Sequence, residues 1–206
     1  MSVVGGSAST GLVARVQNIL MKPAAEWDVI DGEPATVGSL FVGYACILAA
    51  IPAIATLIQM ALFLHNPILG VVVAVLSYVS SLVAVFIMAL IIDALAPSFG
   101  AQKSQVQALK LTVYSYTASW VAGILNIVPI LGILAALAGL YGLYILYLGL
   151  PKLMKSPADK TVGYFVVSIV VAIVVNIIIG FIIAAVTAAM MVSAVAAGGA
   201  ALTAHY

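Results

Sequence analysis

Charged residues are scarce in this chain: only 6% of its 206 residues are Asp, Glu, Lys or Arg. A soluble domain carries about a quarter charged residues, because its surface must face water. Hydrophobic residues make up 66% of the chain. This composition excludes a water-soluble globular protein and predicts an integral membrane protein.

Three other features are missing, and each absence excludes a class of protein or site. The net charge is only +1 and the seven basic residues are scattered, so nucleic acid is not an expected partner. Cys46 is the single cysteine, which excludes an intrachain disulfide and a zinc site built of cysteines. The first ten residues lack the basic and apolar regions of a cleaved signal peptide.

Long uncharged runs occupy most of the chain, and turn signals divide them. A helix needs roughly 20 apolar residues to cross a hydrocarbon core of about 30 Å. The motifs "HNP" and "NIVP" mark turns within two of the runs. We therefore predict an all-α polytopic membrane protein with five transmembrane helices, at about 37–64, 68–96, 108–127, 129–150 and 162–192.

The segments on either side of these spans differ in character. Residues 1–35 form a predicted cytoplasmic N-terminal segment that contains an amphipathic helix lying in the headgroup layer. Its apolar face consists of Leu12, Val13, Val16, Ile19 and Leu20. Arg15 falls on the opposite face, and Trp27, further along, suits either an interfacial anchor or a solvated linker. Residues 193–206 form a predicted external C-terminal tail.

The basic residues indicate how the spans are oriented. With five spans, all seven Lys and Arg fall on one side of the bilayer. Cytoplasmic loops are the ones enriched in Lys and Arg. The sequence thus predicts a cytoplasmic N-terminus and an external C-terminus.

Side chains that could perform catalysis lie apart in this topology. A cysteine or serine nucleophile needs a base within hydrogen-bond reach. Both histidines, His65 and His205, fall on the external side, whereas Cys46 lies nearer the cytoplasmic end of the first span. No zinc-protease motif or phosphate-binding loop is present. We expect no enzyme activity, no catalytic residues, no metal and no bound cofactor.

One acid touches a long apolar run, and polar residues gather near its depth. Asp93 lies about one turn from the cytoplasmic end of the second span. The predicted cluster around it consists of Asp93, Lys110, Tyr114, Ser115, Tyr116 and Tyr144. A carboxylate within the membrane costs a few kcal/mol, so the cluster is either a polar clamp between the second and third spans or a cavity for a proton or ion.

Small residues recur at four-residue spacing on the fourth span. Ala135 with Gly139 and Ala138 with Gly142 form two such pairs. Spacing of this kind lets helix backbones approach closely within a membrane. We predict that these residues serve helix packing rather than phosphate binding.

Three segments resemble the bacterial branch of the Yip1 family of five-span membrane proteins. They read "RVQNILMKPAAEWDVI", "IIDALAPSFGAQKSQVQALKLTVYSYTASWVAGIL" and "LYGLYILYLGLPKLMKSPADKTVGYFVV". The resemblance implies five spans with a cytoplasmic N-terminus and, for the bacterial branch, residence in the cell inner membrane. Eukaryotic members are associated with vesicle traffic and Rab GTPases. This chain has neither their long N-terminal region nor a D-L-Y-G-P motif, so the resemblance does not carry Rab binding over to it.

Two hypotheses for function follow. The first is a non-enzymatic scaffold that organises the lipid bilayer by associating with itself, as a homo-oligomer, or with another membrane protein. The second is a transporter or channel in which Asp93 and the tyrosines line a polar cavity for a small solute, ion or proton.

Overall fold

The computed structural model describes residues 11–63, 65 and 67–203, and every element of secondary structure within them is a helix. The all-α class is therefore confirmed. Four helical stretches in the described chain are long and apolar enough to cross a membrane, namely Val37–Phe63, Pro67–Phe99, Pro129–Leu153 and Ala158–Met190. They agree with four of the five expected spans. Residues 1–10 and His205, on which two of the expectations above rest, lie outside the described residues.

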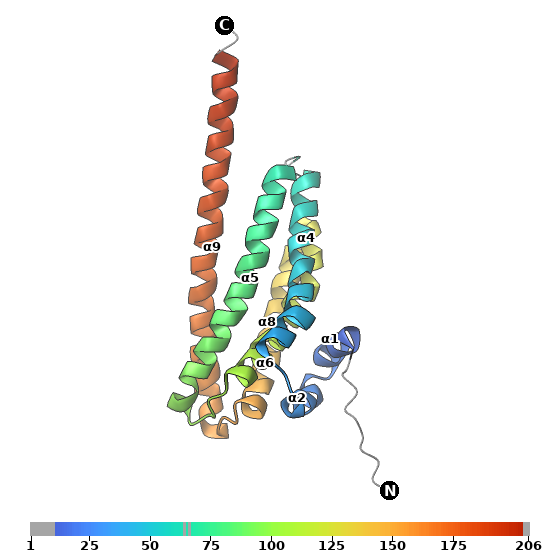
Figure 1. Ribbon diagram of the computed structural model, residues 1–206, viewed down its shortest axis with the longest axis vertical. Coiled ribbons are helices and arrows are strands. Elements are labelled where there is room, and N and C mark those ends of the chain that lie inside the picture. The colour runs from blue at the N-terminus through green and yellow to red at the C-terminus, as the bar shows by residue number, and fades with distance from the viewer. Residues whose placement is uncertain (1–10, 64, 66, 204–206) are drawn as a thin grey trace.

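The first two spans form an antiparallel pair (Figure 1). The first consists of α3 (Val37–Leu40), the π-helical turn η1 (Phe41–Ala45) and α4 (Cys46–Phe63). It begins at Thr36, whose hydroxyl accepts the Ser39 N–H while Ser39 reciprocates, a capping box that fixes the helix start. The second is α5 (Pro67–Leu95), which ends in the 3₁₀ turn η2 (Ala96–Phe99).

The expected third span is not one continuous helix, which corrects the prediction for 108–127. It is divided into α6 (Gln105–Ser115), α7 (Thr117–Ala122) and the 3₁₀ helix η3 (Gly123–Ile127). Its α-helical and 3₁₀ residues together rise about 35 Å, enough to cross the hydrocarbon core. Every residue from 108 to 115 is buried, because this stretch of α6 packs against α3, α5 and α8.

The last two spans are α8 (Gly132–Leu153), which follows a short 3₁₀ turn, η4 (Pro129–Leu131), and α9 (Ala158–Thr203). The helix of α9 continues through most of the segment expected to be a tail from residue 193, whereas its stretch that is apolar and long enough to cross a membrane runs to Met190, close to the expected end of the span at 192. The alanines of this segment are strong helix formers and sustain the helix. Figure 1 shows α9 extending well beyond its neighbours, toward the end opposite to the N-terminal helices.

Two short helices precede the spans, α1 (Leu12–Met21) and α2 (Pro23–Gly32). The expected N-terminal helix is present, but Arg15 does not face water as its position on the helix suggested. Arg15 and Ile19 are the buried residues of α1, while Val13 and Met21 are exposed. Trp27 of α2 is fully buried, so this segment is neither an interfacial anchor nor a solvated linker but a helix docked on the bundle.

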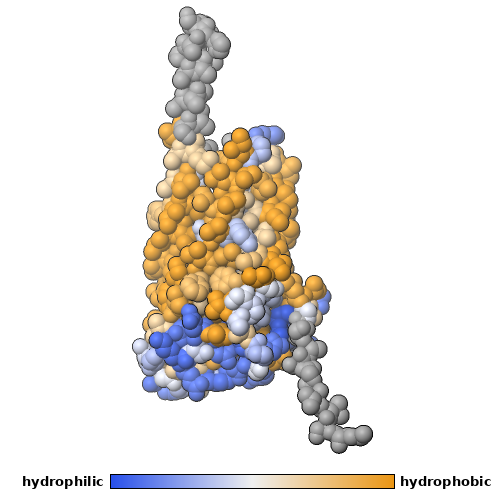
Figure 2. Space-filling model, viewed as in Figure 1, coloured by the Kyte–Doolittle hydropathy of each residue, from blue (hydrophilic) through white to orange (hydrophobic). Residues whose placement is uncertain are grey.

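Hydrophilic residues gather at one end of the molecule. In Figure 2 the shafts of the helices are apolar, and the hydrophilic band covers the end formed by α2 and the neighbouring helix ends. Two ion pairs tie this layer together across its exposed surface, Lys152 Nζ to Asp28 Oδ1 and Lys155 Nζ to Asp31 Oδ2, each at 2.5 Å. The core lies just above, around Trp27 and α6.

Candidate functional site

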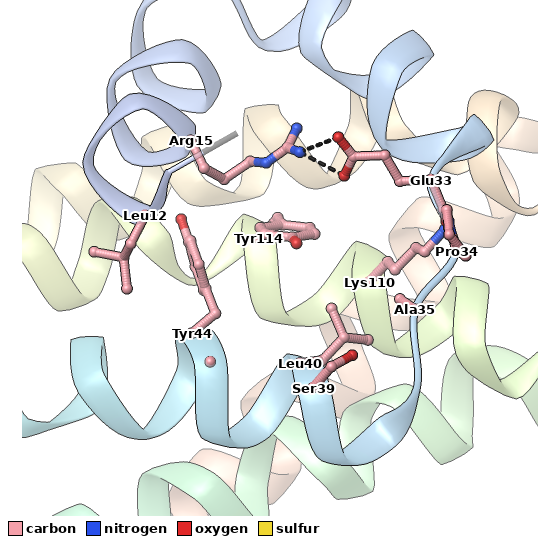
Figure 3. Close-up of a pocket in the computed structure, with 11 residues that line it drawn as sticks. Leu12, Arg15, Glu33, Pro34, Ala35, Ser39, Leu40, Tyr44, Lys110 and Tyr114 are labelled. Atoms are coloured by element: carbon pink, nitrogen blue, oxygen red, sulfur yellow. Dashed lines mark hydrogen bonds and ion pairs between the residues drawn. The ribbon is translucent and has the colours of Figure 1, made fainter. Parts of the chain in front are cut away.

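A pocket of about 290 Å³ lies between α1, the α2–α3 connection, η1 and α6. We call it the interfacial pocket, since it opens beside the hydrophilic end of the molecule. Figure 3 shows its side chains converging from these four segments. It is lined by Leu12, Arg15, Glu33, Pro34, Ala35, Ser39, Leu40, Gly43, Tyr44, Lys110 and Tyr114.

Arg15 forms the centre of the interfacial pocket. Its guanidinium makes a bidentate ion pair with Glu33 and a further ion pair with Glu26. Burial lowers the pKa of Arg15, but the hydrogen bonds and charge of Glu33 outweigh that effect and hold the pKa above its ordinary value. The side chains of Arg15 and Glu26 are 5% and 7% exposed, so this is a buried pair, for which loss of one partner is costly.

Lys110 closes the opposite side of the same pocket. Its Nζ donates to the carbonyl oxygens of Ile30 at 2.9 Å and Glu33 at 2.6 Å. These carbonyls lie at the C-terminal end of α2, where backbone acceptors have no partner within the helix and a cation is favourable. Lys110 therefore fixes the end of α2 to α6.

Two tyrosines connect the pocket to the bundle. The rings of Tyr44 and Tyr114 meet edge to face with centroids 4.8 Å apart. The Tyr44 hydroxyl is 2.8 Å from the Thr117 hydroxyl, and the Arg15 guanidinium lies 5.6 Å from the centre of the Tyr114 ring, within cation–π range. The polar groups of the pocket thus serve to hold α1 and α2 in place.

α2 is fixed from its other face by Trp27. The Trp27 indole N–H donates to the carbonyl of Ile145 on α8 at 3.0 Å. A Cβ on Gly149 would lie 2.7 Å from Trp27 Cε2, so only glycine admits the indole at this position. Gly149 was not predicted as a site residue, because the side chains that it faces, Trp27 and Leu111, are distant in the sequence and leave no local signal.

A second and larger cavity of about 670 Å³ lies deeper, among α5, α6, α7, α8 and α9. We call it the intramembrane cleft. It is lined by Met88, Ile92, Thr112, Ser115, Tyr116, Ser119, Gly139, Leu140, Gly142, Leu143, Leu146, Ile169, Ala172, Ile173, Asn176 and Ile177. Most of these side chains are apolar, and the hydroxyls come from the α6–α7 stretch.

The structure divides the polar cluster expected from the sequence. Lys110 and Tyr114 line the interfacial pocket, whereas Ser115 and Tyr116 line the intramembrane cleft. Tyr144 is 51% exposed on the outer surface of α8, with its ring 5.9 Å from that of Tyr141. The six residues therefore do not form one cavity.

Asp93 is buried near α9 rather than bonded to Lys110, whose ammonium donates to the α2 carbonyls instead. Its Oδ1 has no hydrogen-bond partner among the described residues. Tyr164 of α9 donates its hydroxyl to the carbonyl of Ile92, the residue before Asp93, and interacts electrostatically with the Asp93 carboxyl group. Asp93 therefore lies near α9, and its expected partner Lys110 is bonded to α2 instead.

The small residues of α8 occupy different environments. Gly142 is buried, and a Cβ there would lie 2.8 Å from the Ser115 carbonyl oxygen, so α6 and α8 approach closely at this point. Gly139 has more room, with Ser119 Oγ 3.8 Å from a Cβ. Ala135 and Ala138 are half-buried.

The ion-paired acids were not expected as site residues. Glu26 and Glu33 are seven residues apart, which places them on one side of α2 and its C-terminal end. Four acids in one short segment beside the isolated Arg15 were the signal available in the sequence, but their pairing depends on how α1 folds back onto α2.

The model of one protein family, described as the Yip1 domain, matches residues 18–179. The matched region includes α2, all four long helices in whole or in part, and the segment from α6 to η3. No curated protein and no solved structure matches the chain.

Proposed function

The chain belongs to the Yip1 domain family, and on that premise we propose that it is a non-enzymatic scaffold that organises the membrane by association within the bilayer. The associating surface is α9, and the associating partner is a second copy or another membrane protein. The layer formed by α1 and α2 is the fixed cytoplasmic base of the scaffold.

The exposure of α9 carries this proposal. No residue is buried in its most apolar 18-residue stretch, whereas about a third of the corresponding stretches of the first two spans is buried. With 46 residues it is about 69 Å long, more than twice the hydrocarbon thickness of about 30 Å. Such a helix presents its surface either to lipid or to another protein.

Small residues on α9 favour contact with another protein over contact with lipid alone. Gly180, Ala184 and Ala188 recur at four-residue spacing, and a Cβ on Gly180 would meet no atom within 4 Å. Between membrane helices, association depends on close packing at such positions. The similar residues Gly139 and Gly142 of α8 instead face the α6–α7 stretch of the same chain.

The transport hypothesis receives less support from the same arrangement. Its polar path required Asp93, Tyr114, Tyr116 and Tyr144 to line one cavity. Tyr114 lines the interfacial pocket and Tyr116 lines the intramembrane cleft. Asp93 lies near α9, and Tyr144 lies on the outer surface of α8.

Orientation and location complete the proposal. The seven basic residues lie in α1, in the α1–α2 connection, in α6 and the loop before it, and in the α8–α9 connection with its flanking helix ends. Lys and Arg favour the cytoplasmic side. We infer an inner membrane of a bacterium, with the N-terminus in the cytoplasm and the C-terminus outside.

Cysteine cross-linking in lipid vesicles tests association through α9. In a Cys46→Ala background, single cysteines replace Ala184 on α9 or, as the matched control, Leu137 on α8, since both positions are exposed. A short bifunctional maleimide should yield covalent dimers, or adducts with a co-reconstituted partner, from position 184 and not from position 137. Equal yields at both positions would show collisions rather than association.

A further inference from the structure

The intramembrane cleft contains a polar group that the protein leaves unbonded. Ser115 lines the cleft and is 4% exposed, yet its Oγ has no hydrogen-bond partner in the described chain. A hydroxyl within a helix commonly donates to the backbone carbonyl four residues earlier. Thr112, on the same helix, does so, with its Oγ1 2.9 Å from the carbonyl oxygen of Ala108. A buried hydroxyl without a hydrogen-bond partner is unfavourable, so the Ser115 hydroxyl indicates a bonding group that comes from outside the chain.

The other polar side chains of the cleft include Asn176, Tyr116 and Ser119. Asn176 of α9 donates to the carbonyl of Ala172 at 2.8 Å and interacts with the Tyr116 hydroxyl. Ser119 lies one turn after Ser115, on the same side of the stretch. The cleft therefore presents a small group of hydroxyls on one wall and apolar side chains on the others.

The cleft is open toward lipid. Leu140 and Ile173, at its border, are 62% and 54% exposed. Its walls on α9 run from Ile169 to Ile177, a length of about 12 Å. Its volume of about 670 Å³ lies within the range of roughly 300–1,000 Å³ that is typical of small-molecule sites.

The lining of the cleft restricts the chemistry of what can bind. None of the described residues that line it is charged, and its α9 wall is apolar except for Asn176. A charged group would therefore lie among apolar side chains without a counter-ion, which is unfavourable, whereas a neutral oxygen can bond with the Ser115 hydroxyl.

We propose that the intramembrane cleft binds a neutral lipid, with its hydrocarbon chain along α8 and α9 and its hydroxyl or carbonyl oxygen bonded to Ser115. This site does not depend on association through α9. Gly139 leaves room for the chain, since the nearest atom to a Cβ there is 3.8 Å away.

Photolabelling in vesicles tests the site. The full chain is reconstituted into phosphatidylcholine vesicles that contain a diazirine-bearing hexadecanol, and the labelled residues are mapped by mass spectrometry. Labelling at Leu140 and Ile173 should saturate and be displaced by unlabelled hexadecanol. Labelling at Val79 of α5, which is 50% exposed, should rise in proportion to probe concentration.

Two competitors and three variants separate the elements of the proposal. Hexadecyl phosphate, with the same chain and a charged head, should compete at least tenfold less well than hexadecanol. Ser115→Ala should weaken hexadecanol about fivefold, the effect of one hydrogen bond, and leave competition by hexadecane unchanged. Gly139→Leu should abolish saturable labelling, whereas Gly180→Leu should preserve it, with the melting temperature of each variant recorded.

Several outcomes would overturn the proposal. Labelling that never saturates at Leu140 would mean bulk lipid contact only. If hexadecyl phosphate competed as well as hexadecanol, recognition of a neutral oxygen in the intramembrane cleft would be contradicted. Unchanged saturation in a Gly139→Leu variant that melts like the parent would place the probe elsewhere, and cross-links between copies at cleft positions would assign the cleft to a second chain.

Discussion

Arg15 on α1 and Glu33 at the end of α2 form a bidentate ion pair across 18 residues of sequence, and this pair closes the two N-terminal helices against the bundle. Glu26 provides a second carboxylate to the same guanidinium. The planar guanidinium holds the two carboxylates through separate nitrogens, Nη1 for Glu26 and Nη2 for Glu33, which the single ammonium nitrogen of a lysine does not offer. The first helix of the chain is therefore attached by a buried charge as well as by its apolar side chains.

The first prediction concerns this ion pair. Arg15→Met leaves two acids without their cation in a buried setting, which typically costs about 3–5 kcal/mol. The free energy of unfolding, measured by denaturant titration in detergent micelles, should fall by about that amount. Lys22→Met, at an exposed position, is the matched control and should change the value by less than about 0.5 kcal/mol.

A triple variant separates lost charge from lost shape. Arg15→Met with Glu26→Gln and Glu33→Gln leaves no unpaired charge and should recover most of the loss. An Arg15→Met variant that unfolds like the parent would show that the ion pair contributes nothing to docking.

The second prediction concerns the contact between α2 and α8. Gly149→Ala introduces a methyl group where Trp27 Cε2 is only 2.7 Å from the added Cβ. Overpacking of this kind costs about 1–3 kcal/mol, so the melting temperature in detergent should fall clearly. Gly180→Ala, where no atom lies within 4 Å, should leave it unchanged or slightly higher, and equal effects at the two glycines would contradict the docked position of α2.

How far the sequence predicted the fold differs from element to element. The four long helices follow from local composition, because each one needs only a sufficiently long apolar run. The division of the third span at Tyr116 has no local signal, since neither proline nor glycine occurs there. It was also hard to foresee that α9 would continue past residue 192, because the same alanines and glycines suit either a helix or a tail.

The candidate site was less predictable than the fold, for reasons of tertiary packing. Arg15 was assigned to the polar face of α1, although it lies one turn before Ile19 and therefore borders the apolar face. Its burial depends on Glu26 and Glu33 of the following helix. Likewise, Lys110 and Asp93 were matched by depth in the membrane, but depth does not determine which side of a helix each residue occupies.

The third prediction concerns Asp93. Because its Oδ1 is buried without a partner, Asp93→Leu removes an unfavourable buried group and should keep or raise the melting temperature. Asp93→Asn should have a small effect of about 1 kcal/mol or less. A clear loss of stability in Asp93→Leu would restore the idea of a polar clamp, and loss of a proton flux in vesicles with Asp93→Asn alone would favour transport.

The fourth prediction concerns the passage from α6 to η3. If this broken helix crosses the bilayer, the α8–α9 connection lies on the cytoplasmic side and the C-terminus lies outside. A reporter active only in the periplasm should respond when fused after Tyr206 and stay silent when inserted within residues 152–160. The reverse pattern, a response within residues 152–160 and silence after Tyr206, would mean that α6 to η3 turns back without crossing.

The most direct test of the scaffold function is energy transfer between labelled chains in lipid vesicles, measured as the protein is diluted with lipid. Chains labelled at Lys155→Cys in the Cys46→Ala background should keep their energy transfer on dilution, alone or after addition of the cognate membrane partner. Ala184→Leu together with Ala188→Leu on α9 should reduce it at least tenfold in apparent affinity. Energy transfer that falls to the level of random collisions for the parent chain, together with a solute or proton flux across the same vesicles, would contradict the scaffold and support transport.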